Sequence, residues 1–380
     1  MAFLHPPPRT ARLLAAAIGV AALLATAAPA QSEVSWVVKG RGFGHGVGMS
    51  QYGAYGYAKQ GRGYRFILRH YYSGTSVGRL PGPRVVRVLV DISPRGVGFS
   101  GATRACGRRL AVRRSYEARR AGGVVTLRSS GGRLLTRCGP RLRAAGRGAV
   151  TIGGRRYRGA LEVVPTRSAA DSVNAINAVP VDQYVRGVIA NESPSSWPMA
   201  ALRAQAVAAR SFALTGTLDG NGFDLYDDTR SQVYGGVADE TSRGNRAVAD
   251  TKREVVIHRG RIAQTLFSAC SGGHTESVEN VFFGEPIPYL VGVPDPFDHH
   301  CPLHRWTLRF SGREISARLG GHLDGALKRV VVTRRGDSPR IVWARLVGTR
   351  GTGMIRGDRL AAALGAYDRW MHFRKVATGR

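Results

Sequence analysis

The chain is poor in acidic side chains and in lysine. Its 380 residues contain 25 Asp and Glu against 56 Lys and Arg, a formal net charge of +31, and only 5 of the basic residues are lysines. No apolar run reaches the ~20 residues that cross a bilayer, which excludes a multipass membrane protein. Four cysteines are too few for a small disulfide scaffold. What is present, 43% apolar and 21% charged residues, is typical of a globular protein with room for two or three domains.

The first thirty residues have the pattern of a secretory signal peptide. Arg9 and Arg12 form a basic start, residues 13–24 are apolar, and residues 28–30 supply small side chains at the expected cleavage site. An uncleaved membrane anchor is the alternative, because the apolar run can extend to Ala28. We expect residues 1–30 to be removed and the protein to be secreted or held in the cell envelope.

Export changes what is expected of the cysteines, because thiols outside the cytosol tend to pair. Disulfides Cys106–Cys138 and Cys270–Cys301 would each close a loop of about thirty residues, worth about 3 kcal/mol. Cys270 also stands four residues before His274, so Cys270, His274 and Cys301 are alternatively ligands for zinc. We expect the two disulfides and no cofactor, with zinc as the alternative.

The positive charge is concentrated between Arg104 and Arg158, where 16 arginines occur with Glu117 as the one acid. For an exported protein the expected counter-surface is anionic, such as wall polymers, lipid headgroups or glycans with carboxylates. The alternative is that arginine richness is a feature of composition alone. The sequence has no groove-reading motif and no interleaved basic and aromatic pattern, so nucleic acid is not expected as a partner.

Hydrophobic periodicity and turn residues favour an α+β fold. Strands are expected at 34–39, 85–90, 124–127, 160–164, 254–258, 330–333 and 341–347, and helices at 55–68, from Pro198 to 213, at 240–251, and near Ile315 and Leu360. We expect a signal peptide at 1–30, a glycine-rich segment at 31–84 that contributes to the catalytic body, a β-rich basic subdomain at 85–165, and the main catalytic domain at 166–380. The result is a mixed catalytic body with a β-rich, arginine-rich insertion.

Four glycines alternate with other residues from Gly42 to Gly48, a segment we call the glycine ribbon. Such a backbone can turn tightly and let a polymer approach closely. It lacks the G-x-G-x-x-G spacing of a dinucleotide site. His45, Ser50 and Gln51 supply donors and acceptors suited to sugar hydroxyls. The alternative is a glycine-rich strand packed against a neighbour.

Glu192 follows a run of valine and isoleucine and precedes a turn bounded by Pro194 and Pro198. A carboxyl group held against apolar neighbours has a raised pKa, in the range useful to a general acid. The alternative is a surface or capping glutamate. The next helix is built of small residues with Gln205 and Arg210 as polar exceptions, and residues 267–276 form a glycine turn dense in hydroxyls.

Together these segments resemble the stage II sporulation protein D family, whose relatives are also called amidase enhancers. The matching motifs are GFGHGVGMSQYGA at 42–54, DQYVRGVIANESPSSWPMAALRAQAVAARSFAL at 182–214, DTRSQVYGG at 228–236, FSACSGGHTE at 267–276 and PYLVGVPD at 288–295. The resemblance implies an exported lytic transglycosylase that cleaves MurNAc-GlcNAc linkages in peptidoglycan glycan strands, with Glu192 as catalytic acid and base. We expect glycan contacts from His45, Ser50, Gln51, Tyr52, Gln205, Arg210, Ser271, Gly272, Gly273 and His274.

One departure from the family pattern concerns the GHGVGMSQ stretch, which closes the chain in the family and opens the mature protein here. This order is that of a circular permutation, which is tolerated when chain ends lie close together at the surface. We therefore expect His45, Ser50 and Gln51 to return to the cleft that contains Glu192.

A lytic transglycosylase can work with one carboxyl group, because the sugar's own C6 hydroxyl attacks the anomeric carbon. A hydrolytic glycosidase normally needs two carboxylates about 5–10 Å apart. Hydrolysis stays open as an alternative, with the second carboxylate drawn from Asp182, Asp228, Glu276 and Asp295.

Two other classes of function stay open. The first is a non-catalytic cell-wall-binding amidase enhancer, which the basic subdomain favours. The second is a metal-stabilised structural protein of the envelope. No H-E-x-x-H and no G-x-S-x-G motif is present, which disfavours a peptidase. The expected partners are peptidoglycan glycan strands, anionic wall polymers and, for the enhancer, an amidase.

Overall fold

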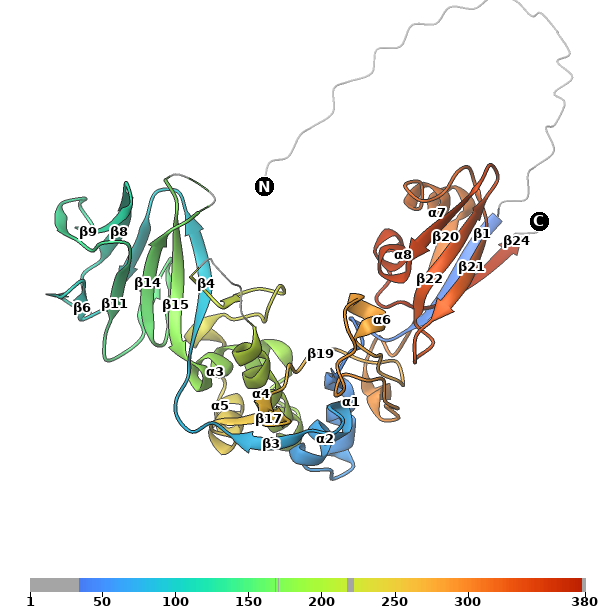
Figure 1. The fold of residues 1–380 in the computed structure, drawn as a ribbon, viewed down its shortest axis with the longest axis horizontal. Coiled ribbons are helices and arrows are strands. Elements are labelled where there is room, and N and C mark those ends of the chain that lie inside the picture. The colour runs from blue at the N-terminus through green and yellow to red at the C-terminus, as the bar shows by residue number, and fades with distance from the viewer. Residues whose placement is uncertain (1–33, 168, 170, 217–221, 378–380) are drawn as a thin grey trace, which may run out of the picture.

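The computed structural model describes residues 34–167, 169, 171–216 and 222–377. A helical middle part carries a β-rich arm on one side and a smaller C-terminal body on the other (Figure 1). The predicted α+β class is confirmed. The predicted signal peptide lies outside the described residues, and among the described ones no helix has the length and apolar character needed to span a membrane.

The β-rich arm consists of two largely antiparallel sheets that share one hydrophobic core. Its strands are β4 (Val85–Ser93), β5 (Val97–Ser100), β6 (Arg104–Ala105), β7 (Arg108–Arg109), β8 (Tyr116–Ala121), β9 (Val124–Ser129), β10 (Leu134–Arg137), β11 (Leu142–Ala145), β12 (Val150–Ile152), β13 (Arg155–Tyr157), β14 (Ala160–Pro165), β15 (Val173–Pro180) and β16 (Leu225–Tyr226). The strand orders are β16-β4-β15-β14-β11-β6-β7 and β10-β9-β8-β5-β12-β13. The predicted disulfide Cys106–Cys138 joins two loops of this arm.

The arm extends beyond the predicted boundary at residue 165. Strand β15 lies between β4 and β14, and all but the last of its residues are buried. Val173 and Val179 pack into the core shared by the two sheets, whereas Ile176 packs on the opposite face with Leu89 and Phe223. Because β15 is covered on both faces, its apolar residues do not alternate with exposed ones, and Asn174 and Asn177 are buried with them.

The middle part is built around a long buried helix, α4. Its helices are α1 (Gln51–Lys59), α2 (Tyr64–Tyr71), α3 (Val181–Glu192), α4 (Met199–Thr215), α5 (Ser242–Asp250) and α6 (Glu279–Phe282), with short 3₁₀ turns η1 (Gly236–Asp239) and η2 (Asp298–His300). Its short strands are β2 (Met49–Ser50), β3 (Ser76–Arg79), β17 (Glu254–His258), β18 (Arg261–Ile262) and β19 (Phe267–Ser268).

Small side chains let α4 pack closely on two sides. Ala204 and Ala208 join the core beneath α1 and α2, and Ala206 and Ala209 join the core shared with α3 and the arm. The single helix predicted at 55–68 is two helices, α1 and α2, separated by a turn that contains two glycines. Glycine costs roughly 1 kcal/mol in a helix interior, which favours the break.

The C-terminal body incorporates the first described strand of the chain. Its elements are β1 (Val34–Arg41), β20 (Arg305–Ser311), α7 (Gly312–Arg318), β21 (Leu327–Arg335), β22 (Ile341–Gly348), β23 (Thr352–Arg356), α8 (Gly357–Leu364) and β24 (Trp370–Ala377). Strand β1 lies between β20 and β24, and a second sheet has the order β21-β22-β23. In Figure 1 the blue β1 is surrounded by red and orange strands.

This arrangement differs from the predicted division at residues 84 and 166. Trp36 and Val38 of β1 share a hydrophobic core with residues of β20, β22 and α8. The segment 31–84 is therefore divided between two bodies, and residues 166–380 do not form a single one. The reason is that the apolar residues of β1 pack with strands that are more than 260 residues away in sequence. Local sequence patterns do not specify such a pairing.

Candidate functional site

The glycine ribbon brings the two most distant motifs together. All four of its glycines have positive φ, from 70° at Gly48 to 109° at Gly44. Strand β2 pairs in parallel with β19, and Phe43 forms a bridge with Cys270. A Cβ atom at Gly48 would lie 2.1 Å from the carbonyl oxygen of Leu266, so only glycine fits there. The ribbon is thus an irregular segment that packs through bridges at Phe43 and Val47, and it leads through β2 to the start of α1.

The start of α1 meets the end of α3. Ser50 caps α1 by accepting a hydrogen bond from the Gly53 N–H at 3.0 Å. Gln51 follows, and its Nε2 donates to Oε2 of Glu192 at 3.0 Å, across 141 residues of sequence. The expected return of Gln51 to Glu192 is therefore found in the structure.

Glu192 is the last residue of α3 and is partly buried. Burial raises the pKa of its carboxyl group, and the hydrogen bonds from Gln51 and from the main chain of Val233 lower it by less. The net direction is upward, as expected from the buried Val188 and Ile189 in the same helix. A carboxyl group in this state holds its proton to a higher pH than an exposed one.

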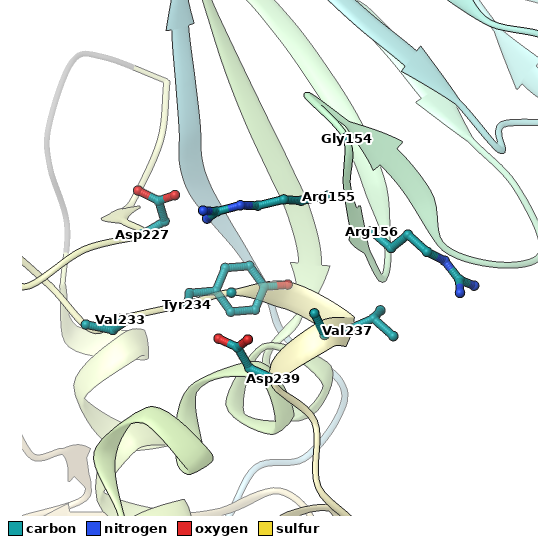
Figure 2. Close-up of a pocket in the computed structure, with 10 residues that line it drawn as sticks. Gly154, Arg155, Arg156, Asp227, Val233, Tyr234, Val237 and Asp239 are labelled. Carbon is teal, nitrogen blue, oxygen red and sulfur yellow. The ribbon is translucent and has the colours of Figure 1, made fainter. Parts of the chain in front are cut away.

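A cavity of about 740 Å³ lies between the arm and the segment 227–239, and its wall includes Val233, whose main chain hydrogen-bonds Glu192. Figure 2 shows Arg155 reaching over Tyr234 towards Asp227, while Arg156 points away. Asn191, next to Glu192, donates a hydrogen bond to Oδ2 of Asp239 at 2.6 Å. Val233 therefore links the wall of the cavity to Glu192, and Asp239 links it to the neighbouring Asn191.

A group of aromatic rings adjoins the Gln51 side of Glu192; we call Tyr52, Tyr55, Trp197 and His300 the aromatic row. The Trp197 ring lies 5.0 Å from that of Tyr52 and 5.1 Å from that of Tyr55, and Tyr55 lies 5.2 Å from His300. Trp197 follows Glu192 by five residues, and Tyr52 follows Gln51. Aromatic walls with a few placed polar groups are typical of ligand-binding sites.

Arg210 is placed away from the candidate site, which corrects its expected role. It is fully buried in α4, where Nε donates to Oδ1 of Asp182 at 2.8 Å and a terminal nitrogen donates to the Glu254 carbonyl at 2.9 Å. Asp182 lies in the first turn of α3, ten residues before Glu192, which is about 15 Å along a helix. Arg210 therefore fastens α4 to α3 and β17 instead of facing the glutamate.

Gln205 lies on the same helix and is 1% exposed. Neither atom of its amide has a hydrogen-bond partner among the described residues. Buried polar groups normally find a partner, so a water molecule or a ligand would satisfy this amide. Within the described ranges no hydrogen bond joins Gln205 to Glu192.

The segment with Ser271, Gly272 and Gly273 is held by buried polar contacts. Ser271 Oγ donates to Oδ2 of Asp295 at 2.7 Å, and the Gly272 N–H donates to Oδ2 of Asp298 at 2.6 Å. The Gly273 N–H donates to Ser271 Oγ at 3.1 Å. With Ser271 at 0% exposure, these groups brace the loop from within and do not present the serine hydroxyl to solvent.

The two expected histidines lie on the side of the C-terminal body. His274 Nδ1 lies 2.7 Å from the Thr275 carbonyl. His45 Nδ1 accepts a hydrogen bond from the Val47 N–H, and burial lowers the pKa of His45 to about 4, so its ring is neutral. Among the described contacts none links either ring to Glu192. Of the expected glycan contacts, the structure thus gathers Gln51 and Tyr52 near Glu192.

Cys270 and Cys301 form the second predicted disulfide. Their sulfur atoms are bonded to each other and are not thiolate ligands. Within the described residues no group of three or more His, Cys, Asp or Glu side chains is placed to hold a metal ion. The donor set of Cys270, His274 and Cys301 therefore does not fit zinc in this structure.

The candidate second carboxylates have other partners. Asp182 pairs with Arg210, Asp228 pairs with Arg230 at 2.7 Å on the surface, and Glu276 accepts a hydrogen bond from Ser338 Oγ at 2.5 Å. Asp295 is buried beneath α1, where Tyr71 donates to it at 2.7 Å. Two other carboxylates, Asp227 and Asp239, lie in the cavity wall.

Comparisons with known proteins agree with the motifs. Residues 169–258, which include α3, α4 and Glu192, match the model of the family described as stage II sporulation protein. An uncharacterized protein of Brachyspira hyodysenteriae is 37% identical over 175 residues, 45% of this chain and 46% of that protein. The amidase enhancer of Bacillus subtilis is 37% identical over 134 residues, 35% of this chain and 18% of its own length. Stage II sporulation protein D of Bacillus subtilis is 30% identical over 169 residues, 40% of this chain and 49% of the relative.

These matches confirm the resemblance to the stage II sporulation protein D and amidase-enhancer family, and the chain carries a domain of that family at residues 169–258. The matched region spans less than half the length of each of these three relatives.

Proposed function

We propose that this protein cleaves the glycan strands of cell-wall peptidoglycan as a lytic transglycosylase, with Glu192 as its general acid and base. The observation that carries the proposal is the carboxyl group itself: it is partly buried, its pKa is raised, and Gln51 holds it by a hydrogen bond that joins the two most distant motifs of the chain. The likeness to an amidase enhancer and to stage II sporulation protein D supports a role in the cell wall.

The proposed reaction starts with protonated Glu192, the form that burial favours. The carboxyl group gives its proton to the glycosidic oxygen, the bond from that oxygen to the anomeric carbon breaks, and positive charge develops on the sugar ring. The Glu192 carboxylate then takes the proton of the C6 hydroxyl, whose oxygen bonds to the anomeric carbon and leaves a 1,6-anhydro end. No water is consumed, and Glu192 regains its proton.

Gln51 and the aromatic row have complementary parts in this scheme. The Gln51 amide donates to Oε2 and stabilises the carboxylate formed after the first proton transfer, while burial keeps the net change in the pKa of Glu192 upward. Half-buried rings of Tyr52 and Tyr55 offer apolar surfaces on which the faces of sugar rings can pack. Holding the strand in this way positions the linkage near the proton donor.

The arm supports anionic wall polymers as a second class of partner. A hollow of about 630 Å³ in it is lined by Arg108, Arg109, Arg114 and Arg133 together with hydroxyl groups, and no acidic side chain lines it. Such a cluster attracts polyanions at moderate ionic strength. An exported protein that binds the envelope through this arm would keep Glu192 near its substrate.

The test of the proposal is Glu192→Gln, which keeps the shape of the side chain and removes its acidity. Purified glycan strands are incubated with each protein and the products are analysed by mass spectrometry. We expect release of anhydro-ended fragments to fall by roughly 10²–10⁴-fold, with an unchanged melting temperature. Undiminished release by the variant would remove Glu192 from the chemistry.

A second candidate is the non-catalytic amidase enhancer, which the 37% identity to a protein of that name favours. Its test uses the Glu192→Gln protein with intact cell wall and a purified wall amidase. Stimulation of the amidase by the variant, together with the absence of anhydro ends from the wild type, would favour this function over the first.

A further inference from the structure

The sheet β20-β1-β24 presents a face without acidic side chains. The register places Arg305, Arg41 and Trp370 in one row across the three strands, and Thr307, Lys39 and His372 in the next. Neighbouring strands are about 4.8 Å apart and such rows about 6.8 Å apart. None of the three strands contains Asp or Glu. This face therefore carries closely spaced positive charges.

A groove of about 700 Å³ opens on this face. Lys39, Arg41 and Arg305 line it together with both tryptophans, Trp306 and Trp370. Gly40 and its partner Trp306 alternate with Lys39 and Arg41, so the Trp306 ring fills the place of a side chain at Gly40 on the core face of the sheet, where a Cβ atom would lie 2.1 Å from it. The floor of the groove is thus the sheet itself, packed from below.

The charges of the groove are not neutralised by a neighbouring acid. Asp368, next to this region in sequence, is fully buried and accepts two hydrogen bonds from the guanidinium of Arg340. The Arg41 guanidinium lies 5.4 Å from the centre of the Trp370 ring. Lys39 and Arg305 are exposed and have no ion pair among the described residues. A ligand with negative charges would satisfy them.

Exposed aromatic rings connect the groove with the glycine ribbon. Trp306 packs on Tyr367 with ring centres 5.6 Å apart, and Tyr367 packs on Phe43 at 5.9 Å. Tyr367 is 40% and Phe43 44% exposed, so both rings extend the apolar surface beyond the groove. Phe43 lies in the ribbon that leads to Gln51.

We propose that this groove is a second binding site, separate from Glu192, for an acidic glycan strand. Lys39, Arg41 and Arg305 bind the carboxylates of the strand, and the edge of Trp370 contacts its sugar rings. A sugar chain fits better than a phosphodiester polymer because the groove and the rings beyond it supply apolar surface beside each charge. Peptidoglycan glycan as the occupant rests on the proposed function, whereas the groove uses none of the residues around Glu192.

The experiment measures binding of glycan strands freed of their peptides, whose lactyl carboxylates are exposed, to the full-length protein carrying Glu192→Gln. The groove variant adds Lys39→Ala, Arg41→Ala and Arg305→Ala. A matched control adds Arg313→Ala, Lys328→Ala and Arg329→Ala, which remove the same charge from exposed positions elsewhere in the C-terminal body. Each exposed ion pair is worth a few-fold in affinity, so we expect the groove variant to raise Kd about tenfold and the control about twofold or less.

Two further arms identify the ligand chemistry. Strands with amidated carboxylates should bind the parent about as weakly as untreated strands bind the groove variant, and poly(glycerol phosphate) should compete poorly. An unchanged Kd in the groove variant, equal binding of amidated strands, or stronger binding of poly(glycerol phosphate) would each overturn the proposal. If the triple variant fails to fold, Lys39→Glu, a single exposed substitution, decides in the same assay. Because binding is measured without cleavage, failure of this site and failure of Glu192 as catalyst give different results.

Discussion

Replacing Gln51 tests whether the ribbon and α1 tune the acid at the end of α3. Gln51→Met keeps an unbranched side chain of similar length and removes the donor that lies 3.0 Å from Glu192 Oε2. A hydrogen bond to a charged acceptor is worth about 1.5–3 kcal/mol, and one pKa unit corresponds to about 1.4 kcal/mol. Glu192 is only partly buried and keeps its bond from Val233, so the lower end applies. We expect the pKa of Glu192 to rise by about one unit.

The assay is the pH dependence of kcat/KM for release of anhydro-ended fragments. The general acid must be protonated, so activity falls as the pH rises through its pKa, and the alkaline limb should move about one unit upward in Gln51→Met. Gln60→Met changes the same residue type at the exposed far end of α1 and should leave the limb in place. An alkaline limb that stays at the wild-type pH in Gln51→Met refutes the assigned contact.

Two further predictions concern stability. Burial raises the pKa of Asp295 from 3.8 to about 7, so the folded state holds this proton more tightly than the unfolded state, and stability is lost as the pH rises from about 4 through about 7. In urea unfolding, Asp295→Asn should remove this loss, so that its free energy of unfolding at pH 8 exceeds that of the wild type by at most about 4 kcal/mol. A wild type that is equally stable at pH 5 and pH 8 contradicts this prediction. Arg210→Met breaks the buried pair with Asp182 and should lower the free energy of unfolding by about 3–5 kcal/mol. The alkaline limb of the activity profile should stay in place. A shifted limb in a variant of full stability would instead show that Arg210 belongs to the site.

Sequence patterns predicted much of the local structure. The strand at 254–258 is found as expected, and helix α4 begins directly after Pro198. Helix α3 was not predicted, since its run of valine and isoleucine also suits a strand and no side chain caps its start. The raised pKa of Glu192 could be predicted from the sequence, because the apolar residues next to it in sequence are also its neighbours in the helix.

Contacts between segments that are distant in sequence were harder to predict. The motifs predicted that Gln51 would meet Glu192, but not that Trp197, Tyr52 and Tyr55 form a row beside them. The spacing of Tyr52 and Tyr55 on one helix face could have indicated this row. Asp227 and Asp239 line the cavity from a loop that faces the arm, and the path of that loop could not be predicted from local patterns. The sequence could not show that Arg210 lies outside the site, because arginine serves equally well in a buried ion pair and in a ligand-binding site.

The origin of the oxygen at the new sugar end tests the central claim most directly. Cleavage is run in water enriched in ¹⁸O, and the fragments are analysed by mass spectrometry. If the C6 hydroxyl attacks, the new end is a 1,6-anhydro sugar without solvent label. One ¹⁸O atom at the new reducing end would instead show that water attacks, and would contradict the single-glutamate mechanism.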